Sequence, residues 1–366
     1  MARVQLGLGG RRGLIGRSRC PTRRCTGRSP RASAQNTKAH GGPGRRCIID
    51  VAVQGFAGER QNVSQTQDIV TSSTFSTTFH ADWGGIMSRY LTLCGSPTAE
   101  LSEPWDLTAA VLNLERFWLP RMPRAVFRAK GLPEITSLTT FLTLVEAGED
   151  LSPYQSRLYQ PSFNDLLLND LGIRHFHMTE PAAPRVDQLL FAIVQAKVFY
   201  AVAVQGHSAF KAEALVEEVH VNWPELLAEF IPPNVVPGSH KGPSISKRAA
   251  FRKVGLMTAI QVSDGTIYLP PGGGVTTGGL GGHRGLSVVV VIDANKAMTY
   301  ITNLERATLD AAERIAAMID ESDKHLTLAC RGNILWGVSQ SGQTAIRLGE
   351  SPIRLRIEDD RWLTSR

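Results

Sequence analysis

The sequence predicts an α+β protein in which N-terminal helices and a small antiparallel sheet are followed by a second α+β domain. Three observations support this class. Apolar residues recur at helical spacing in residues 105–118 and 135–146. Short apolar runs of strand length follow, without helical spacing, between residues 173 and 204. Beyond a Pro/Gly/Ser-rich link, one long amphipathic pattern lies among further short runs of strand length.

The first domain is expected over residues 87–230. Three helices are predicted at its start, each ended by proline or glycine: 105–118, 135–146 and 163–171. Ser162 and Asp165 have the spacing of a capping box for the third helix, and Gly172 supplies its stop.

Strands are then expected at 173–178, 189–194 and 199–204, the last two forming an antiparallel hairpin around residues 195–198. The run 189–194 is apolar on both faces, as in a covered central strand. Helices at 212–220 and 224–230 complete this domain.

Residues 231–250 are the expected linker, and residues 251–366 the accessory α+β domain. A hairpin is predicted there around Ser263-Asp264-Gly265, followed by a valine-rich strand at 287–293. A long helix with Ile301 and Leu304 on its apolar stripe comes next. The closing strands are expected at 326–330, 334–338 and 344–348.

The N-terminal segment differs from the rest in charge. Residues 1–47 hold 12 Lys and Arg and no Asp or Glu, whereas the remaining 28 basic and 33 acidic residues give a net −5. The basic charge is therefore weak evidence for a nucleic-acid-binding core. Residues 1–86 are interpreted as a disordered leader, either an organellar transit peptide or translated sequence upstream of a start at Met87.

Two histidines separated by a single residue are the main functional signal. In a strand, His175 and His177 would project to one face about 7 Å apart. Imidazole titrates near neutral pH, so the pair suits proton transfer, for example in phosphodiester chemistry, or metal binding. A third ligand for a metal-dependent enzyme is unassigned unless His207 comes across the sheet, because Glu180 is too close in sequence for a cupin-like site. The remaining interpretation is structural, with both rings hydrogen-bonded along a half-buried strand.

The same segment resembles a known family. A His-bearing strand, the runs LLFAIV and FYAVAVQGH, and an aromatic residue three positions after His207 are similar to the sheet of RelE/ParE-like toxins. The resemblance covers roughly residues 105–220 and implies helices before a curled antiparallel sheet, and cleavage of RNA. Ser208 stands where that family usually has a basic residue, which argues against an Arg- or Lys-driven mechanism.

The resemblance leads to a functional hypothesis: a cytoplasmic, metal-independent ribonuclease with RNA as substrate and an antitoxin-like protein partner. His175 and His177 would act as acid and base, with His207 as the next candidate. Arg185 and Lys211 would stabilise the developing charge, as would Arg174, although Arg174 should face away from the histidines. No cofactor or metal is expected, and no 18-residue apolar run predicts a membrane span. The alternative is a non-catalytic binding or oligomerisation module.

One further motif is the glycine-rich segment 270–282. Its spacing matches neither dinucleotide-binding nor phosphate-loop patterns, since Arg284 stands where the third glycine is needed. The segment is also expected to precede a strand, which leaves no helix N-terminus for a phosphate. A flexible surface loop is therefore predicted.

Overall fold

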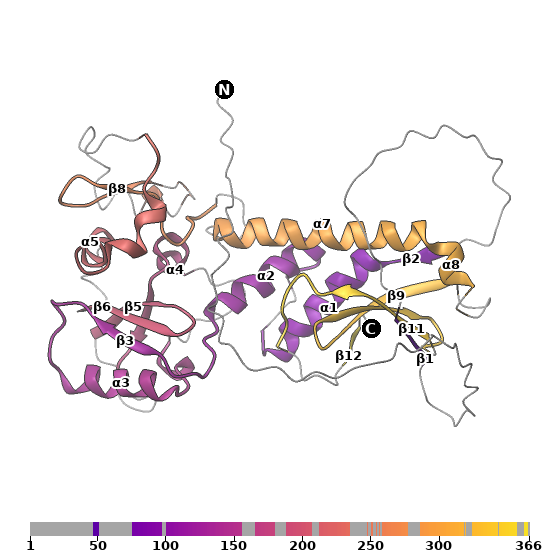
Figure 1. Cartoon of the computed structure of the whole chain (residues 1–366), viewed down its shortest axis with the longest axis horizontal. Helices are drawn as coiled ribbons and strands as arrows, with labels where there is room; N and C mark the ends of the chain where they lie inside the picture. The colour runs from indigo at the N-terminus through magenta and orange to yellow at the C-terminus, as the bar shows by residue number, and fades with distance from the viewer. Residues whose placement is uncertain are drawn as a thin grey trace, which may run out of the picture. The chain divides into compact units, whose positions relative to one another are not determined.

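The computed structural model describes residues 47–50, 75–96, 100–155, 165–179, 188–206, 212–234, 258–276, 286–317, 324–342, 344–356 and 362–364, with residue 319 and isolated positions between 247 and 256. The fold is α+β, which confirms the predicted class (Figure 1). The described residues from 47 onward belong to one compact unit.

The first sheet is built mainly from the C-terminal strands. Its order is β1-β11-β10-β9-β12, and β2 pairs with β9. The strands are β1 (Cys47–Asp50), β2 (Ser76–Thr77), β9 (His325–Arg331), β10 (Ile334–Ser339), β11 (Thr344–Glu350) and β12 (Trp362–Thr364). The three central strands are antiparallel and match the predicted closing strands, whereas β1 and β2 join in parallel from the N-terminal side.

Helices from both ends of the chain share a core with this sheet. They are α1 (Phe79–Leu93), α2 (Pro104–Phe117), α7 (Val288–Asp310) and α8 (Ala312–Ala316). Phe79, Trp83 and Ile86 in α1 are fully buried in this core. Residues 75–86 are therefore structural, which corrects their assignment to a disordered leader. The Ser/Thr-rich run at 71–78 hid the i, i+4, i+7 pattern that begins at Phe79.

The valine-rich segment predicted as a strand is the start of α7 (Figure 1). Ser287 caps this helix, because its hydroxyl accepts a hydrogen bond from the Val289 N–H at 3.2 Å. Val290 and Ala294 then extend the buried stripe that continues through Ile301, so tertiary packing overrides the β-propensity of valine. Neither α7 nor any other helix in the described ranges is long and apolar enough to cross a membrane.

The second sheet carries the two histidines. Its order is β3-β6-β5-β4, with β3 (Ala125–Arg128), β4 (Arg174–His177), β5 (Gln188–Val194) and β6 (Val198–Gly206). The predicted strands at 173–178, 189–194 and 199–204 are confirmed, and β5 and β6 are antiparallel. The sheet is not purely antiparallel as expected, because β3 pairs with β6 in parallel. The strand β3 was not predicted, because it is only four residues long and lies in a stretch bounded by Pro123 and Gly131.

Helices pack on both faces of the second sheet. On one face, α3 (Thr136–Ala147) contributes Phe141 to a cluster with Phe176 and Phe199. On the other, α4 (Leu166–Leu171) and α5 (Ala212–Asn222) pack over Phe191 and Val202. Smaller elements are the 3₁₀ turns Ser152–Tyr154, Pro224–Leu226 and Ala228–Phe230, and the hairpin of β7 (Ile260–Gln261) and β8 (Ile267–Tyr268).

The described part of the glycine-rich segment is not a flexible surface loop. The N–H groups of Gly272 and Gly274 donate to the Asp170 and Asn169 carbonyls, which lie at the C-terminal end of α4. A Cβ on Gly272 would lie 2.4 Å from the Leu168 carbonyl oxygen. Glycine is therefore needed for close backbone approach. The segment also leads to the N-terminus of α7 instead of to a strand, while residues 277–285 lie outside the described ranges.

Candidate functional site

Strand β4 places both predicted histidines on the face that α4 and α5 cover. His175 is paired with Phe191 and His177 with Leu189 across β5, and both partners belong to the core beneath those helices. The residue His177 is only 5% exposed, and the His175 side chain is 19% exposed. The prediction that both histidines project to one face of the strand is therefore correct. That face is largely buried, however, and of the two histidines only His175 retains substantial access to solvent.

Asp165 holds the imidazole of His175. One carboxylate oxygen, Oδ1, accepts hydrogen bonds from the N–H groups of Leu167 and Leu168 at 2.9 and 3.0 Å and so caps α4. The other, Oδ2, lies 3.5 Å from His175 Nδ1. A carboxylate beside Nδ1 favours a proton on that nitrogen, which leaves Nε2 as the basic position.

The sequence pointed to Asp165 only as part of a capping box. The structure makes it the N-cap residue itself, because the helix starts at Leu166. Helix capping and pairing with an imidazole use different oxygens of the same carboxylate, so one residue serves both. Sequence spacing reveals the first role and not the second, since β4 meets the start of α4 only in the folded chain.

Arg116 is a cation near this pair that the sequence did not single out. Its guanidinium donates to the Ser287 hydroxyl at 2.7 Å and to the Leu168 carbonyl at 3.5 Å, and so links α2, α4 and the start of α7. Burial lowers the pKa of Arg116, and attraction to Asp293 and Asp165 opposes that shift. Within the apolar pattern of residues 105–118 it has no distinguishing signal.

Arg174 lies on the opposite face from the histidines, as alternation predicts. Its guanidinium donates to the main-chain carbonyls of Phe117, at 3.1 Å, and Arg116. These bonds attach β4 to the C-terminal end of α2. Arg174 therefore has a structural role, and its proposed part in stabilising charge is not supported.

The other predicted site residues, His207, Arg185 and Lys211, lie outside the described residues. Over the ranges that the structure describes, no group of three or more His, Cys, Asp or Glu side chains is placed to hold a metal ion. The described part of the site therefore consists of His175, Asp165 and the nearby Arg116.

Three aromatic rings extend the histidine-bearing face toward the edge strand β3. Phe127 stacks on Tyr200, with ring centroids 5.4 Å apart and planes 22° apart, and Tyr200 meets the edge of Trp223 at 5.1 Å. Phe127 is 48% exposed, so part of its ring is available to a ligand. Arg128 and Lys130, which follow Phe127 in the chain, are also exposed.

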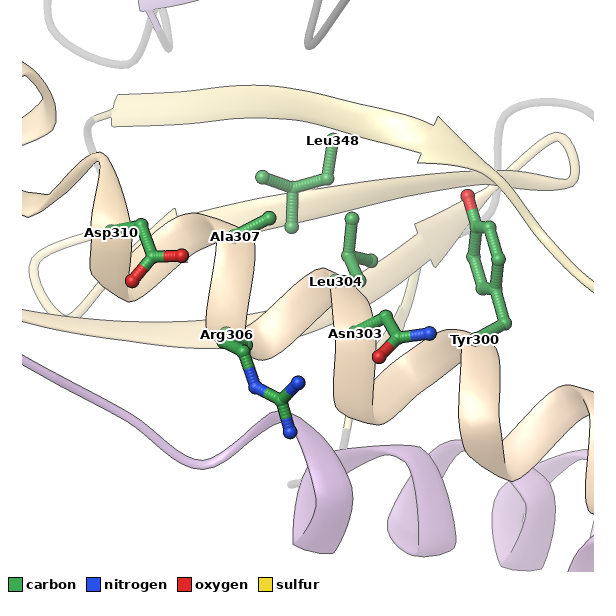
Figure 2. A pocket seen from close by; sticks show the side chains of 7 residues that line it. All are labelled: Tyr300, Asn303, Leu304, Arg306, Ala307, Asp310 and Leu348. Carbon is green, nitrogen blue, oxygen red and sulfur yellow. The ribbon is translucent and has the colours of Figure 1, made fainter. Parts of the chain in front are cut away.

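A separate hollow of about 450 Å³ lies between α7 and β11 (Figure 2). It contains none of the residues that the sequence marked as functional.

Comparison of the chain with protein-family models, curated proteins and solved structures finds no match.

Proposed function

We propose that the second sheet and its helices form a cytoplasmic, metal-independent ribonuclease of the toxin type, in which His175 performs proton transfer. The observation that carries the proposal is the contact between Asp165 Oδ2 and His175 Nδ1 at 3.5 Å. A carboxylate that orients an imidazole is a recurring arrangement of a general base and its positioning residue. His177 is too buried to share this role and is assigned to the support of β4.

The reaction is a transesterification. His175 Nε2 takes the proton of the 2′-hydroxyl, whose oxygen then attacks the adjacent phosphorus. The bond from phosphorus to the 5′-oxygen breaks, and the imidazolium returns its proton to that leaving oxygen. The products are a 2′,3′-cyclic phosphate and a free 5′-hydroxyl, with no external reactant. Asp165 stabilises the imidazolium between the two transfers.

The aromatic residues favour a single-stranded nucleic acid over phosphodiesters that carry no base, and the 2′-hydroxyl that the reaction uses makes this nucleic acid RNA. A nucleobase stacked on the exposed ring of Phe127 would continue the column that Tyr200 begins. Such stacking contributes about 1–3 kcal/mol per base and works with single strands of any sequence. Phe127 and His175 lie on the same face of the sheet, three strands apart, and α4 and α5 cover the strands between them. An oligonucleotide of several residues that passes around these helices would be needed to reach both.

The test is cleavage of single-stranded RNA by the full chain in EDTA. The variant His175→Asn should lose about 10²–10⁴-fold in rate, and Asp165→Asn should lose a smaller factor. His220→Asn is the matched control, because His220 of α5 is equally exposed and is also near a carboxylate, with its Nε2 3.2 Å from Asp264 Oδ2. Substrate with a 2′-deoxy group at the cleaved position should be resistant.

The pH dependence distinguishes one histidine from two. A single imidazole that must start neutral gives a rate that rises once with pH and then stays level, whereas an acid–base pair gives a bell. An intact RNA substrate after incubation with wild type, or equal rates for His175→Asn and wild type, would contradict the proposal.

The binding module remains a second candidate on the strength of a different surface. Ile231 and Leu269 are each 48% exposed and adjacent, because the Leu269 N–H donates to the Phe230 carbonyl at 2.7 Å. Neighbouring exposed apolar side chains suit a protein partner, such as an antitoxin. This candidate predicts that the purified wild-type chain forms an oligomer, measured by light scattering, and that the double variant Ile231→Asp/Leu269→Asp does not. It also predicts that wild type leaves RNA uncut.

A further inference from the structure

The hollow beside α7 has the size and shape of a small-molecule site. Its volume of about 450 Å³ falls within the roughly 300–1,000 Å³ of typical ligand pockets. Residues from three successive turns of α7 line it, and Leu348 of β11 closes the opposite side (Figure 2). All of these residues lie outside the second sheet, so the site is independent of the proposed ribonuclease.

The floor of the pocket is apolar. Leu304 and Leu348 face one another across it and are 8% and 6% exposed, so their remaining surface is turned toward the cavity (Figure 2). Ala307 lies one turn of the helix from Asn303 and Leu304, where its small side chain leaves the space open. An aliphatic or aromatic group of modest size fits this floor, and its burial would release water from three apolar side chains.

Tyr300 forms the end wall and is held in place by Gly349. A Cβ at Gly349 would lie 2.6 Å from the Tyr300 hydroxyl oxygen, so the hydroxyl lies directly against the β11 backbone. Burial raises the pKa of Tyr300, and repulsion from Glu350 raises it further. The hydroxyl is therefore a neutral group at physiological pH and does not repel an anion.

Two charges of opposite sign lie at the rim. Arg306 and Asp310 are four residues apart on α7, which places their Cβ atoms about 6 Å apart on one side of the helix. Within the described part of the chain, neither forms an ion pair or hydrogen bond with another side chain or with the backbone. In Figure 2 the Arg306 side chain extends away from the strands and Asp310 lies beside Ala307. Both charged groups can accept a ligand without breaking an existing pair.

We propose that this pocket binds a free α-amino acid with an apolar side chain. The apolar group lies on Leu304, Ala307 and Leu348, and the two charges of the ligand meet the two charges of the rim. Asp310 takes the ammonium. Arg306 turns from the orientation in Figure 2 toward the cavity and takes the carboxylate together with the Asn303 amide. A zwitterion whose charges are a few ångströms apart matches the spacing of the two side chains, whereas a simple fatty acid or amine would leave one of them unused.

The experiment is ligand-observed NMR on the full chain with leucine. A ligand of this size should bind with a dissociation constant on the order of 1 mM. Two analogues test the charges: 4-methylpentanoate lacks the amine, and 3-methylbutylamine lacks the carboxylate. Each should bind at least about tenfold more weakly, the factor expected for losing one charge-assisted contact.

Variants assign the contacts. Asp310→Asn should weaken leucine binding until its affinity is close to that of 4-methylpentanoate for wild type. Arg306→Gln should weaken it until its affinity is close to that of 3-methylbutylamine for wild type. Ala307→Trp should abolish binding by filling the floor. Glu313→Gln is the matched control, because this exposed carboxylate lies beyond the pocket in α8. No leucine signal at roughly ten times the expected constant, or a signal that survives Ala307→Trp in the folded variant, would overturn the proposal.

Discussion

Trp83 offers the sharpest test of the core that α1 contributes. The side chain is fully buried, and its indole N–H donates to the Thr108 hydroxyl at 2.9 Å within the packing of α1 against α2. Replacing a buried tryptophan by alanine typically costs about 3–5 kcal/mol through lost transfer free energy and the cavity left behind. The lost hydrogen bond is a further term of about 1 kcal/mol. Such a loss is a large fraction of a typical unfolding free energy of about 5–15 kcal/mol.

The measurement is urea unfolding of the full chain, followed by far-ultraviolet circular dichroism because the substitution removes a fluorophore. Trp83→Ala should lower the unfolding free energy by about 4–6 kcal/mol, and Trp83→Phe, which keeps most of the apolar volume, by about 1–2 kcal/mol. Leu93→Ala is the control in the same helix, because Leu93 is 54% exposed and its truncation should cost under about 0.5 kcal/mol.

A chain that starts at Met87 extends the same test. It lacks Phe79, Trp83 and Ile86, all fully buried, and should not unfold cooperatively. Equal stability of Trp83→Ala and Leu93→Ala, or a cooperative transition in the shortened chain, would show that α1 does not pack as described.

Two further changes test other parts of the fold. Gly272→Ala should cost about 1–3 kcal/mol or more, since its Cβ would lie 2.4 Å from the Leu168 carbonyl oxygen. Gly131→Ala should be nearly neutral in the same denaturation assay, because the nearest atoms to its Cβ are 3.9 Å away. Burial raises the pKa of the Cys330 thiol from about 9 to about 11, so wild type should lose stability relative to Cys330→Ala as the pH rises from 9 to 11. The loss in the unfolding free energy of wild type relative to Cys330→Ala should approach about 2–3 kcal/mol in denaturant titrations. A difference between the two unfolding free energies that does not change with pH would contradict this prediction.

Local patterns predicted the second sheet well because each of its later strands is a short apolar run between turn residues. The hairpin of β5 and β6 closes with a hydrogen bond from Gln195 N–H to the Val198 carbonyl, within the predicted turn. The helix α3 likewise ends at Gly148, which has a φ of 79° that favours glycine. In these cases the residues that determine an element are neighbours in sequence.

Prediction failed where distant segments decide the structure. The run Val288–Val291 has strand propensity, yet it is helical because Val290 is buried in the core that α7 shares with α1, α2 and the first sheet. The strand β3 forms because β6 supplies hydrogen bonds to its backbone, and the four residues of β3 show no pattern that predicts this pairing. Period-two alternation put His175 and His177 on one face, but it could not tell that α4 and α5 cover that face.

The two candidate sites differ in how far residue type can reveal them. His175 attracts notice because imidazole is uncommon and reactive, and its partner Asp165 belongs to a recognisable helix start. The pocket beside α7 consists of residues that any amphipathic helix carries, and it exists because the helix passes the end of β11 where Gly349 admits the Tyr300 hydroxyl. For the first site, removal of one group should abolish the chemistry. For the second, the shape of the floor matters as much as any single group, so a variant that fills the space, such as Ala307→Trp, is the more discriminating perturbation.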